Sequence, residues 1–484
     1  MTTSGSTDLS VTERLLPAFK DGVLPAPPAD LLLLGEFPDA GVALKARGYR
    51  IERLPWRQPS FREPLPAGAR GELLQVRLRA PELAGRRFDA VLALDLAPDI
   101  HPLALFDELD TLLAPDGVVV LAGPMAREDA TSHWLDYLAA LGGRCGFSMD
   151  EPGDGAASPF FSRVFRRSAT PPRWRVNHVL PENFAEVSAL FQEVFGHPMS
   201  RELWEWKYGA GRGNAVMARN DGKVVAHYGG MYRDILSCGK PDRVAQICDV
   251  MVQSRERGVL TRQGPFFLLG ASWPEVYGPK GFGFPSERHI RLAEKMGLYV
   301  EAGQLAEVRW EPASAGVRLG TKVRHVDPES AADKAMVNGL WARMAEDLRD
   351  GVVGIRDWDF VVQRYFRHPH HKYEVLAVSA RFTGRPLGIA VLRRHEACCE
   401  LLDVIGPLSN LAPVIDQARR MTGRWGLPYM YCWITRNHLP RFLACGGREQ
   451  QLDISIPASS WTADPQPEQF VGKWWLMSGD TDFH

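Results

Sequence analysis

The sequence predicts a chain of mixed α/β and α+β class, with one parallel-sheet unit followed by two units that resemble each other. Short apolar segments alternate with amphipathic ones over residues 30–168, which is typical of strands and helices in a parallel sheet. A Gly/Ser/Pro-rich link ends near residues 169–173, and the pattern that follows it occurs twice. We therefore expect a loose leader at 1–27 and domains at 28–170, 171–320 and 321–484.

Length and composition favour a soluble multidomain protein. A chain of 484 residues is too long for one hydrophobic core, so several domains are expected. The 57 basic and 58 acidic residues leave a formal charge of −1. This balance gives no overall field that would recruit nucleic acid or an anionic membrane, and we expect neither partner.

Cysteine usage and the apolar segments indicate the cytoplasm. Seven cysteines are scattered without a CxxC pair, which is typical of a reduced protein. The strongest apolar run near the start, Leu31 to Leu34, is too short to span a membrane or to form a secretory signal.

The first domain begins with the apolar strand LLLLG at 31–35, and helix and strand segments then alternate as far as HWLDYLAALGG. The stretch from Phe88 to Pro124 resembles the second half of a Rossmann-like class I methyltransferase, a family that binds S-adenosylmethionine beside a Gly-rich turn. Here that turn contains Glu36 and Pro38, and no acidic residue follows the segment LLQVRLRAP to hold adenine. We therefore expect a degenerate scaffold domain without S-adenosylmethionine.

The rest of the chain contains matching elements at an offset of about 150–160 residues, which predicts a tandem duplication. Each repeat has a helix, an aromatic and basic helix, a strand pair, a strand with one aspartate, and a helix closed by glycine. The matching pairs are 181–195 with 327–349, 204–208 with 361–365, 215–230 with 374–391, 247–252 with 401–406, and 286–298 with 436–447; the paired aspartates are Asp249 and Asp403.

This order of elements resembles the GNAT acetyltransferase superfamily over residues 172–484. In that family the fourth strand diverges from the next and ends in an Arg/Gln-x-x-Gly-x-Gly/Ala loop. The loop amides and the following helix dipole bind the pyrophosphate of coenzyme A. The resemblance implies an acyl-CoA-dependent N-acyltransferase, with acetyl-CoA as the donor and a small amine as the acceptor.

The matching loop follows the strand at 247–252. Arg257-Gly258 fits the family's Arg-Gly step, whereas Leu260 replaces the next glycine. The resemblance then implies a longer loop in which Thr261 and Arg262 contact phosphate and Gly264 opens a helix at Pro265. It also implies an oxyanion donor among the backbone amides near Met251 or Val252, and a carrier contact from Ser286. The second repeat has Pro407 to Leu411 here, without arginine or a glycine pair, so no carrier is expected to bind there.

Acyl transfer to an amine also needs a base for the ammonium and an acid for the departing thiolate. Asp249 and His227 lie on the expected strands and are base candidates. The counterpart of Asp249 in the second repeat favours a structural role for it, and a core position is the alternative for His227. Ala293 stands where the family has a tyrosine acid, so His289 and Tyr299 are the acid candidates.

Aromatic residues are expected around the acceptor. Trp206 and Tyr208 lie on the aromatic and basic helix and Phe284 lies in GFGFP, with core packing as the alternative for the tryptophan. In the last segment, Asp480 and Asp482 either attract a cationic amine or belong to a frayed tail. The clusters at His368–His371 and His395–Cys399 lack the spacing of zinc sites, so no metal is expected.

Two other functions stay open at this stage. A Fem-type transferase would take its acyl group from charged tRNA, through a basic channel without a pyrophosphate loop. A non-enzymatic scaffold would have lost both chemistries. Leu260 and the absent tyrosine favour that alternative, whereas Arg257-Gly258 and Gly264 oppose it.

Overall fold

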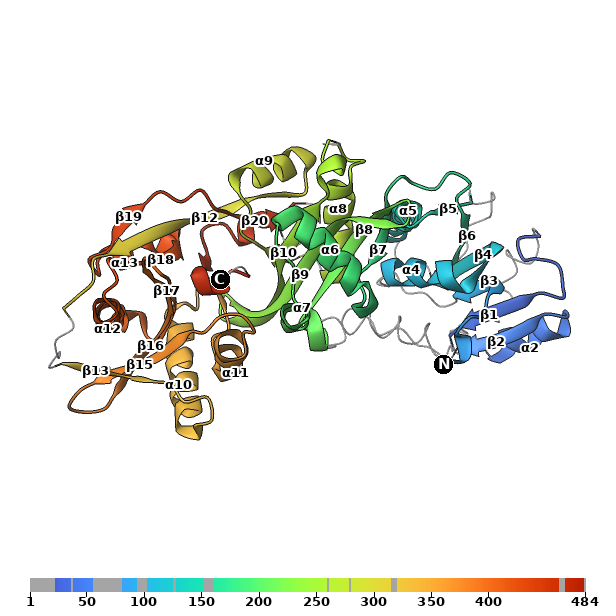
Figure 1. Cartoon of the computed structure of the whole chain (residues 1–484). Coiled ribbons are helices and arrows are strands. Elements are labelled where there is room, and N and C mark those ends of the chain that lie inside the picture. Colours follow the sequence, from blue (N-terminus) through green and yellow to red (C-terminus); the bar gives the residue numbers. More distant parts are fainter. Residues whose placement is uncertain are drawn as a thin grey trace.

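The structure, a computed structural model, describes residues 22–35, 38–54, 81–93, 102–124, 128–150, 160–258, 261–277, 280–314, 320–460 and 466–482. Its strands form three sheets that follow one another along an elongated molecule, with the N-terminal sheet at one end (Figure 1). The C-terminal segment lies between the second and third sheets (Figure 1). Most of the expected leader lies outside the described residues.

The first sheet has the strand order β2-β1-β3-β4-β6-β5. Its elements are β1 (Asp30–Leu34), α2 (Pro38–Ala46), β2 (Arg50–Leu54), β3 (Phe88–Ala93), α4 (Pro102–Leu112), β4 (Leu113–Pro124), α5 (Glu128–Arg144), β5 (Phe147–Met149) and β6 (Phe160–Arg167). Strands β1 to β4 are parallel, and β6 runs antiparallel to β4 and β5. The expected alternation of strands and helices is thus present. Leu31 to Leu34 are buried on both faces of β1, as in a sheet covered by helices.

The features that argue against S-adenosylmethionine cannot be compared with the structure. Glu36 and the segment LLQVRLRA at 73–80 lie outside the described residues. The likeness of this unit to a methyltransferase stays a prediction.

The second sheet has the order β11-β10-β9-β14-β21, and β8 and β7 extend it from β9. Its elements are β7 (Arg175–His178), α6 (Phe184–Phe195), α7 (Arg201–Tyr208), β8 (Gly213–Asn220), β9 (Lys223–Ser237), β10 (Lys240–Val252), α8 (Pro265–Tyr277), β11 (Gly281–Phe282), α9 (Glu287–Met296), β14 (Val352–Gly354) and β21 (Trp474–Trp475). Local chemistry sets several helix ends. The Ser200 hydroxyl accepts from the Leu203 amide at the start of α7, and Gly297 in the left-handed region ends α9.

The third sheet has the order β13-β15-β16-β17-β18-β12-β19, and β20 also pairs with β12. Its elements are β12 (Tyr299–Trp310), β13 (Thr321–His325), α10 (Ala331–Asp347), α11 (Trp358–Val361), β15 (Glu374–Ala380), β16 (Pro386–Arg394), β17 (Cys399–Ile405), α12 (Leu411–Arg424), β18 (Met430–Thr435), α13 (Leu439–Leu443), β19 (Arg448–Gln450) and β20 (Ser455–Ser459). The helices and strands that the sequence predicted at matching positions of the second and third units are therefore present.

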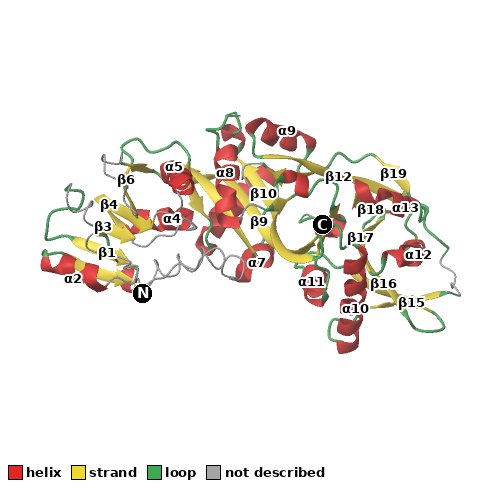
Figure 2. Ribbon diagram, turned by 180° about the vertical axis from the view of Figure 1, so that it is seen from behind, coloured by secondary structure: helices red, strands yellow, loops and turns green. Residues whose placement is uncertain are grey.

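The two sheets exchange strands, so they do not separate at the expected boundary between residues 320 and 321. Strand β12 lies before that boundary but pairs with β18 of the third sheet. Strands β14 and β21 lie after it but extend the second sheet beyond β9. The long curved strands β9 and β10 reach toward the third sheet, as Figure 2 shows. The second and third units are therefore joined by backbone hydrogen bonds as well as by the chain.

The last described segment fills a gap in the third sheet. Strands β17 and β18 pair only at Cys399–Met430 and Glu400–Tyr431 and then diverge. Residues 477–481 lie in the opening. The Ser478 hydroxyl accepts from the Trp433 amide at 3.1 Å, and a Cβ on Gly479 would stand 2.9 Å from the Leu402 carbonyl oxygen. The tail is therefore packed against both strands and is not frayed over these residues.

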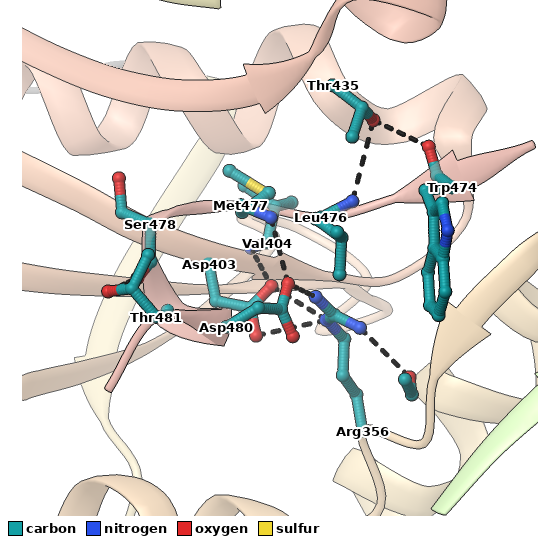
Figure 3. Close-up of polar contacts among 12 residues, drawn as sticks. Arg356, Asp403, Val404, Thr435, Trp474, Leu476, Met477, Ser478, Asp480 and Thr481 are labelled. Atoms are coloured by element: carbon teal, nitrogen blue, oxygen red, sulfur yellow. Dashed lines mark hydrogen bonds and ion pairs between the residues drawn. The ribbon is translucent and has the colours of Figure 1, made fainter. Parts of the chain in front are cut away.

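A buried charge cluster holds the tail in this gap (Figure 3). The Arg356 guanidinium contacts Asp403 at 2.9 Å and Asp480 at 2.5 Å, and all three side chains are buried. Asp480 also accepts from the Met477 amide at 2.8 Å. A buried guanidinium is tolerated only with such partners, so Asp480 stabilises the tail and not an external ligand. This contact argues against the alternative in which Asp480 attracts a cationic amine.

Among the described helices, none combines the length and the apolar character needed to cross a membrane.

Replacing Asp480 by alanine should destabilise the protein, because Arg356 would stay buried with only one of its two carboxylates. We expect Asp480→Ala to lower the free energy of unfolding by about 3 kcal/mol in a urea titration. Glu468→Ala, at an exposed position of the same tail, should change it by less than about 0.5 kcal/mol. Equal effects in the two variants would contradict a buried role for Asp480.

Candidate active site

A cavity of about 500 Å³ opens where β10 and β11 diverge. The two strands pair only at Ala245–Gly281 and Gln246–Phe282. Beyond that point Ile247 to Val250 form one wall and Gly283 to Ser286 the other. The strand divergence that the resemblance implied is therefore present, and the cavity lies between the two diverging strands.

The wall on β10 contains a β-bulge at Asp249. The pairing of β10 with β9 shifts register between Cys248 and Met251, and Asp249 has a φ of 49°. A left-handed conformation costs a residue with a Cβ about 1 kcal/mol, and aspartate is among the residues that tolerate it. The bulge turns Asp249 out of the strand alternation, so its carboxylate faces the cavity.

Two side chains hold the Asp249 carboxylate. Lys207 of α7 donates from Nζ at 2.8 Å, and the Tyr208 hydroxyl donates at 2.6 Å. Lys207 also contacts Asp482 of the C-terminal segment at 3.1 Å. Residue 229 of β9 must be glycine for this arrangement, because a Cβ there would collide with the Tyr208 hydroxyl.

The charges in this cluster leave one carboxylate better placed to take a proton. Burial alone would raise the pKa of Asp249, but Lys207 and Tyr208 outweigh it and hold that pKa below its ordinary value. Burial raises the pKa of Asp482, and the neighbouring negative charge of Asp249 raises it further. The pKa of Lys207 is raised, since the two aspartates more than offset its burial. One ammonium thus faces two carboxylates, and Asp482 is the one that takes a proton more readily.

His227 lies behind the bulge and not in the cavity. It is fully buried, and its Nδ1 lies 2.7 Å from the Asp249 carbonyl oxygen. Because a carbonyl oxygen only accepts, Nδ1 carries the proton. Burial lowers the pKa of His227, so the ring stays neutral. The structure therefore makes it a positioning residue for the bulge instead of the base that the sequence suggested.

The opposite wall contains the two acid candidates. His289 and Tyr299 both line the cavity, and the His289 Nε2 and the Tyr299 hydroxyl lie 2.7 Å apart. Burial lowers the pKa of His289 to about 4 and raises that of Tyr299 well above its ordinary value. Phe284 and Ser286 line the same cavity.

The loop after β10 presents its arginines to solvent. Glu256 is buried and accepts from Arg173 at 3.0 Å, from the Trp174 indole at 2.9 Å and from Asn220 at 3.1 Å. This anchor turns the neighbouring Arg257 outward, where its Nε donates to the Val252 carbonyl at 2.8 Å.

The helix after the loop starts where the sequence predicted. Gly264 is buried, its amide donates to the Thr261 carbonyl, and α8 begins at the next residue. Gly258, Thr261 and Arg262 are exposed beside this helix start. Leu260 lies outside the described residues.

Four of the predicted residues lie elsewhere. Met251 and Val252 are back in register with β9, after the bulge, and do not line the cavity. The bulge residues Asp249 and Val250 take the place that was expected for them. Tyr208 is buried behind Asp249, and Trp206 faces a second cavity. The resemblance placed the oxyanion donor at Met251 or Val252 because the register shift before Met251 leaves no mark in the sequence.

Sequence reasoning missed two contributions to the cavity. The sequence placed Lys207 on the aromatic and basic helix beside the acceptor, but it did not indicate the two aspartates that pair with this lysine, which is rarely buried without such partners. His368, His370 and His371 of the third unit also line the cavity. The His368 Nδ1 accepts from the His370 and His371 amides, and no group of metal-ligating residues occurs in the described part of the chain.

The third unit repeats part of this geometry. Tyr365 donates to Asp403 at 2.9 Å, as Tyr208 does to Asp249. The cation differs, since Arg356 takes the place that Lys207 has in the second unit. The opening beside Asp403 is filled by residues 477–481, whereas the opening beside Asp249 is a cavity.

Residues 175–264, from β7 to the residue before α8, match the family model of the acetyltransferase (GNAT) domain. This part of the chain is therefore similar to a GNAT acetyltransferase domain. This match supports an enzyme, and it ends at the loop described above.

No curated protein matches the chain in sequence. Several solved structures show partial similarity at low identity. A probable N-acyltransferase from Enterococcus faecalis V583 is 12% identical over 59% of this chain and 71% of that chain, with a TM-score of 0.46. A GCN5-related N-acetyltransferase from Kribbella flavida is 14% identical over 59% and 70%, with a TM-score of 0.43. A Saccharomyces cerevisiae N-myristoyltransferase is 9% identical over 60% and 81%, with a TM-score of 0.41.

Acid should destabilise the protein through His289. The folded pKa of about 4 lies below the ordinary value of 6.5, so the unfolded chain binds the extra proton first. We expect stability to fall as pH drops from about 6.5 to about 4, with His289 contributing up to about 1.4 kcal/mol per pH unit. In urea titrations across this range, His289→Gln should have a shallower slope than the parent protein. An unchanged slope would contradict the burial of a neutral ring.

Proposed function

We propose that the cavity between β10 and β11 is the transfer site of an acyl-CoA-dependent N-acyltransferase with a small amine acceptor. The observation that carries the proposal is the bulged, diverging strand that ends in an arginine-bearing turn at a helix N-terminus. The GNAT match over the same residues supports it. Acetyl-CoA is the donor that the resemblance to the GNAT superfamily implies.

The residues around the loop suit a phosphorylated carrier. Arg257 and Arg262 are exposed beside the start of α8, whose first amides and dipole favour an anion. Gly258, Thr261 and Gly264 would let the backbone approach it, and Ser286 would contact the arm that enters the cavity. Acyl-CoA would supply an activated thioester there.

The remaining chemistry falls to side chains of this chain. Asp249 and Asp482 give the wall a negative charge that binds an ammonium group, and Asp482 accepts its proton because its pKa is raised. Lys207 keeps both carboxylates in place. The Tyr299 hydroxyl, paired with His289, stays protonated and can donate a proton to the departing thiolate.

We infer separate roles for the other two units. The third unit, as the second copy of a tandem GNAT-like pair, supplies histidines and the tail to the site but holds no carrier, since its own opening is filled. The first unit is a degenerate methyltransferase-like scaffold without S-adenosylmethionine. A cytoplasmic location follows from the cysteine usage. Unlike the proposed function, the Fem-type and scaffold alternatives both predict that coenzyme A does not bind in the titration below.

Coenzyme A binding tests the carrier half of the proposal. In calorimetric titrations the parent protein should bind coenzyme A and acetyl-CoA with micromolar affinity. Arg257→Ala/Arg262→Ala should weaken binding by at least about tenfold, because it removes two charge-assisted contacts. Arg394→Ala, at an exposed position of the third sheet, should bind like the parent. Absence of binding to the parent would overturn the proposal and favour the Fem-type or scaffold alternative.

A variant of Asp482 tests the second half of the proposal, the reaction with the amine acceptor. In a screen of small amines with acetyl-CoA, Asp482→Asn should lower kcat/KM by about 10²–10⁴ for any amine accepted, since it removes the proton acceptor. Its affinity for coenzyme A should stay unchanged. Asp453→Asn, at an exposed site near β20, serves as the control. Full activity of Asp482→Asn would exclude this residue as the base.

A further inference from the structure

A second cavity, of about 350 Å³, lies where the second and third units meet. Its walls come from β9, from the start of α11 and from the tail strand β21, and it shares no lining residue with the proposed transfer site. The two cavities are separated by Trp206, which faces the second, and His368, which faces the first. Their ring centroids are 4.6 Å apart.

Arg233 of β9 is the unusual residue of this cavity. Its Nε donates to Gln246 Oε1 at 2.8 Å, and its guanidinium carbon lies 5.5 Å from the centre of the Phe360 ring. Its Nη2 is buried and has no hydrogen-bond partner within the described ranges. No carboxylate of those ranges forms an ion pair with it. Burial lowers the pKa of Arg233 to about 10, with a further contribution from the positive charge of Arg364.

Of the four aspartates that line the cavity, three are already engaged. Asp480 contacts Arg356, and Asp234 contacts Arg243. Asp357 accepts from the Phe360 amide as the N-cap of α11. Asp359 also borders the cavity but is exposed to solvent.

The other arginines of the cavity are engaged as well. Arg364 donates to the Gly479 and Thr481 carbonyls, and Arg212 donates to the Trp206 carbonyl. Arg233 is thus the guanidinium that keeps donor capacity for a ligand.

The support of Arg233 is rigid. Gln246 is fully buried on β10, and its Oε1 fixes the plane of the guanidinium. The Gln246 Nε2 also lacks a partner in the described part of the protein. A buried guanidinium without an anion is costly, and its planar fork matches a carboxylate. Aromatic side chains form much of the remaining wall: Trp206, Phe282, Phe360 and Trp474.

We infer that this cavity binds a small carboxylate with an aromatic or apolar body, whose carboxylate pairs with Arg233. The ligand is distinct from the acyl carrier, because the cavity lies on the other side of Trp206 from the strand divergence. The volume suits a ligand of one ring and a short acid chain.

Phenylacetate and benzoate are suitable probes for calorimetric titration of the full chain, with benzyl alcohol as the neutral analogue and inorganic phosphate as an anion without a ring. The parent protein should bind phenylacetate saturably, at least about tenfold more tightly than benzyl alcohol or phosphate. Arg257→Ala/Arg262→Ala should bind phenylacetate like the parent, which separates this site from the proposed carrier site.

Two variants locate the site. Arg233→Met should weaken phenylacetate binding at least about tenfold without lowering the unfolding midpoint, because it removes an unpaired buried charge. Gln246→Glu keeps Arg233 but places a carboxylate beside it, so it should also weaken phenylacetate binding. Arg343→Met, at an exposed position of α10, should bind like the parent. The inference is overturned if the parent shows no saturable binding, if benzyl alcohol binds equally well, or if both cavity variants keep the parent's affinity.

Discussion

The buried ammonium group of Lys207 is the constraint on which the candidate site depends. An ammonium removed from water needs paired carboxylates, and here they come from a bulged strand and from the end of the chain. The position of α7, the shape of the bulge and the path of the tail are therefore coupled. His227 and Tyr208 stabilise Asp249 from the side away from the cavity. His227 binds its carbonyl oxygen, and Tyr208 binds its carboxylate. The left-handed backbone at Asp249 persists because these contacts offset its cost.

The tail also explains how the openings in two similar units come to differ. In the third unit the opening between β17 and β18 is filled by residues 477–481, and Arg356 binds a carboxylate of that segment. The chain then continues to Asp482 at the other opening. One segment thus closes one cleft and completes the wall of the other.

Charge is distributed over the site in a way that suits two different substrates. Exposed arginines surround the start of α8, where a helix N-terminus already favours anions. Inside the cavity the ammonium group of Lys207 faces the carboxyl groups of Asp249 and Asp482. In the proposed function, the polyanionic carrier would therefore bind at the start of α8 and the cationic acceptor at the aspartates of the cavity. Each place would disfavour the other substrate.

The sequence determined the features that depend on neighbours along the chain. Gly264 before α8 and Gly297 after α9 are examples, since local backbone chemistry sets helix ends, and the aspartate of β10 was visible as well. The structure alone decided which of these residues meet. Lys207 and Asp482 are 275 positions apart, and the bulge that turns Asp249 into the cavity leaves no mark in the alternation of residues. The histidines of the third unit, the filled opening and the exchanged strands likewise result from packing between distant segments, which local propensity does not encode.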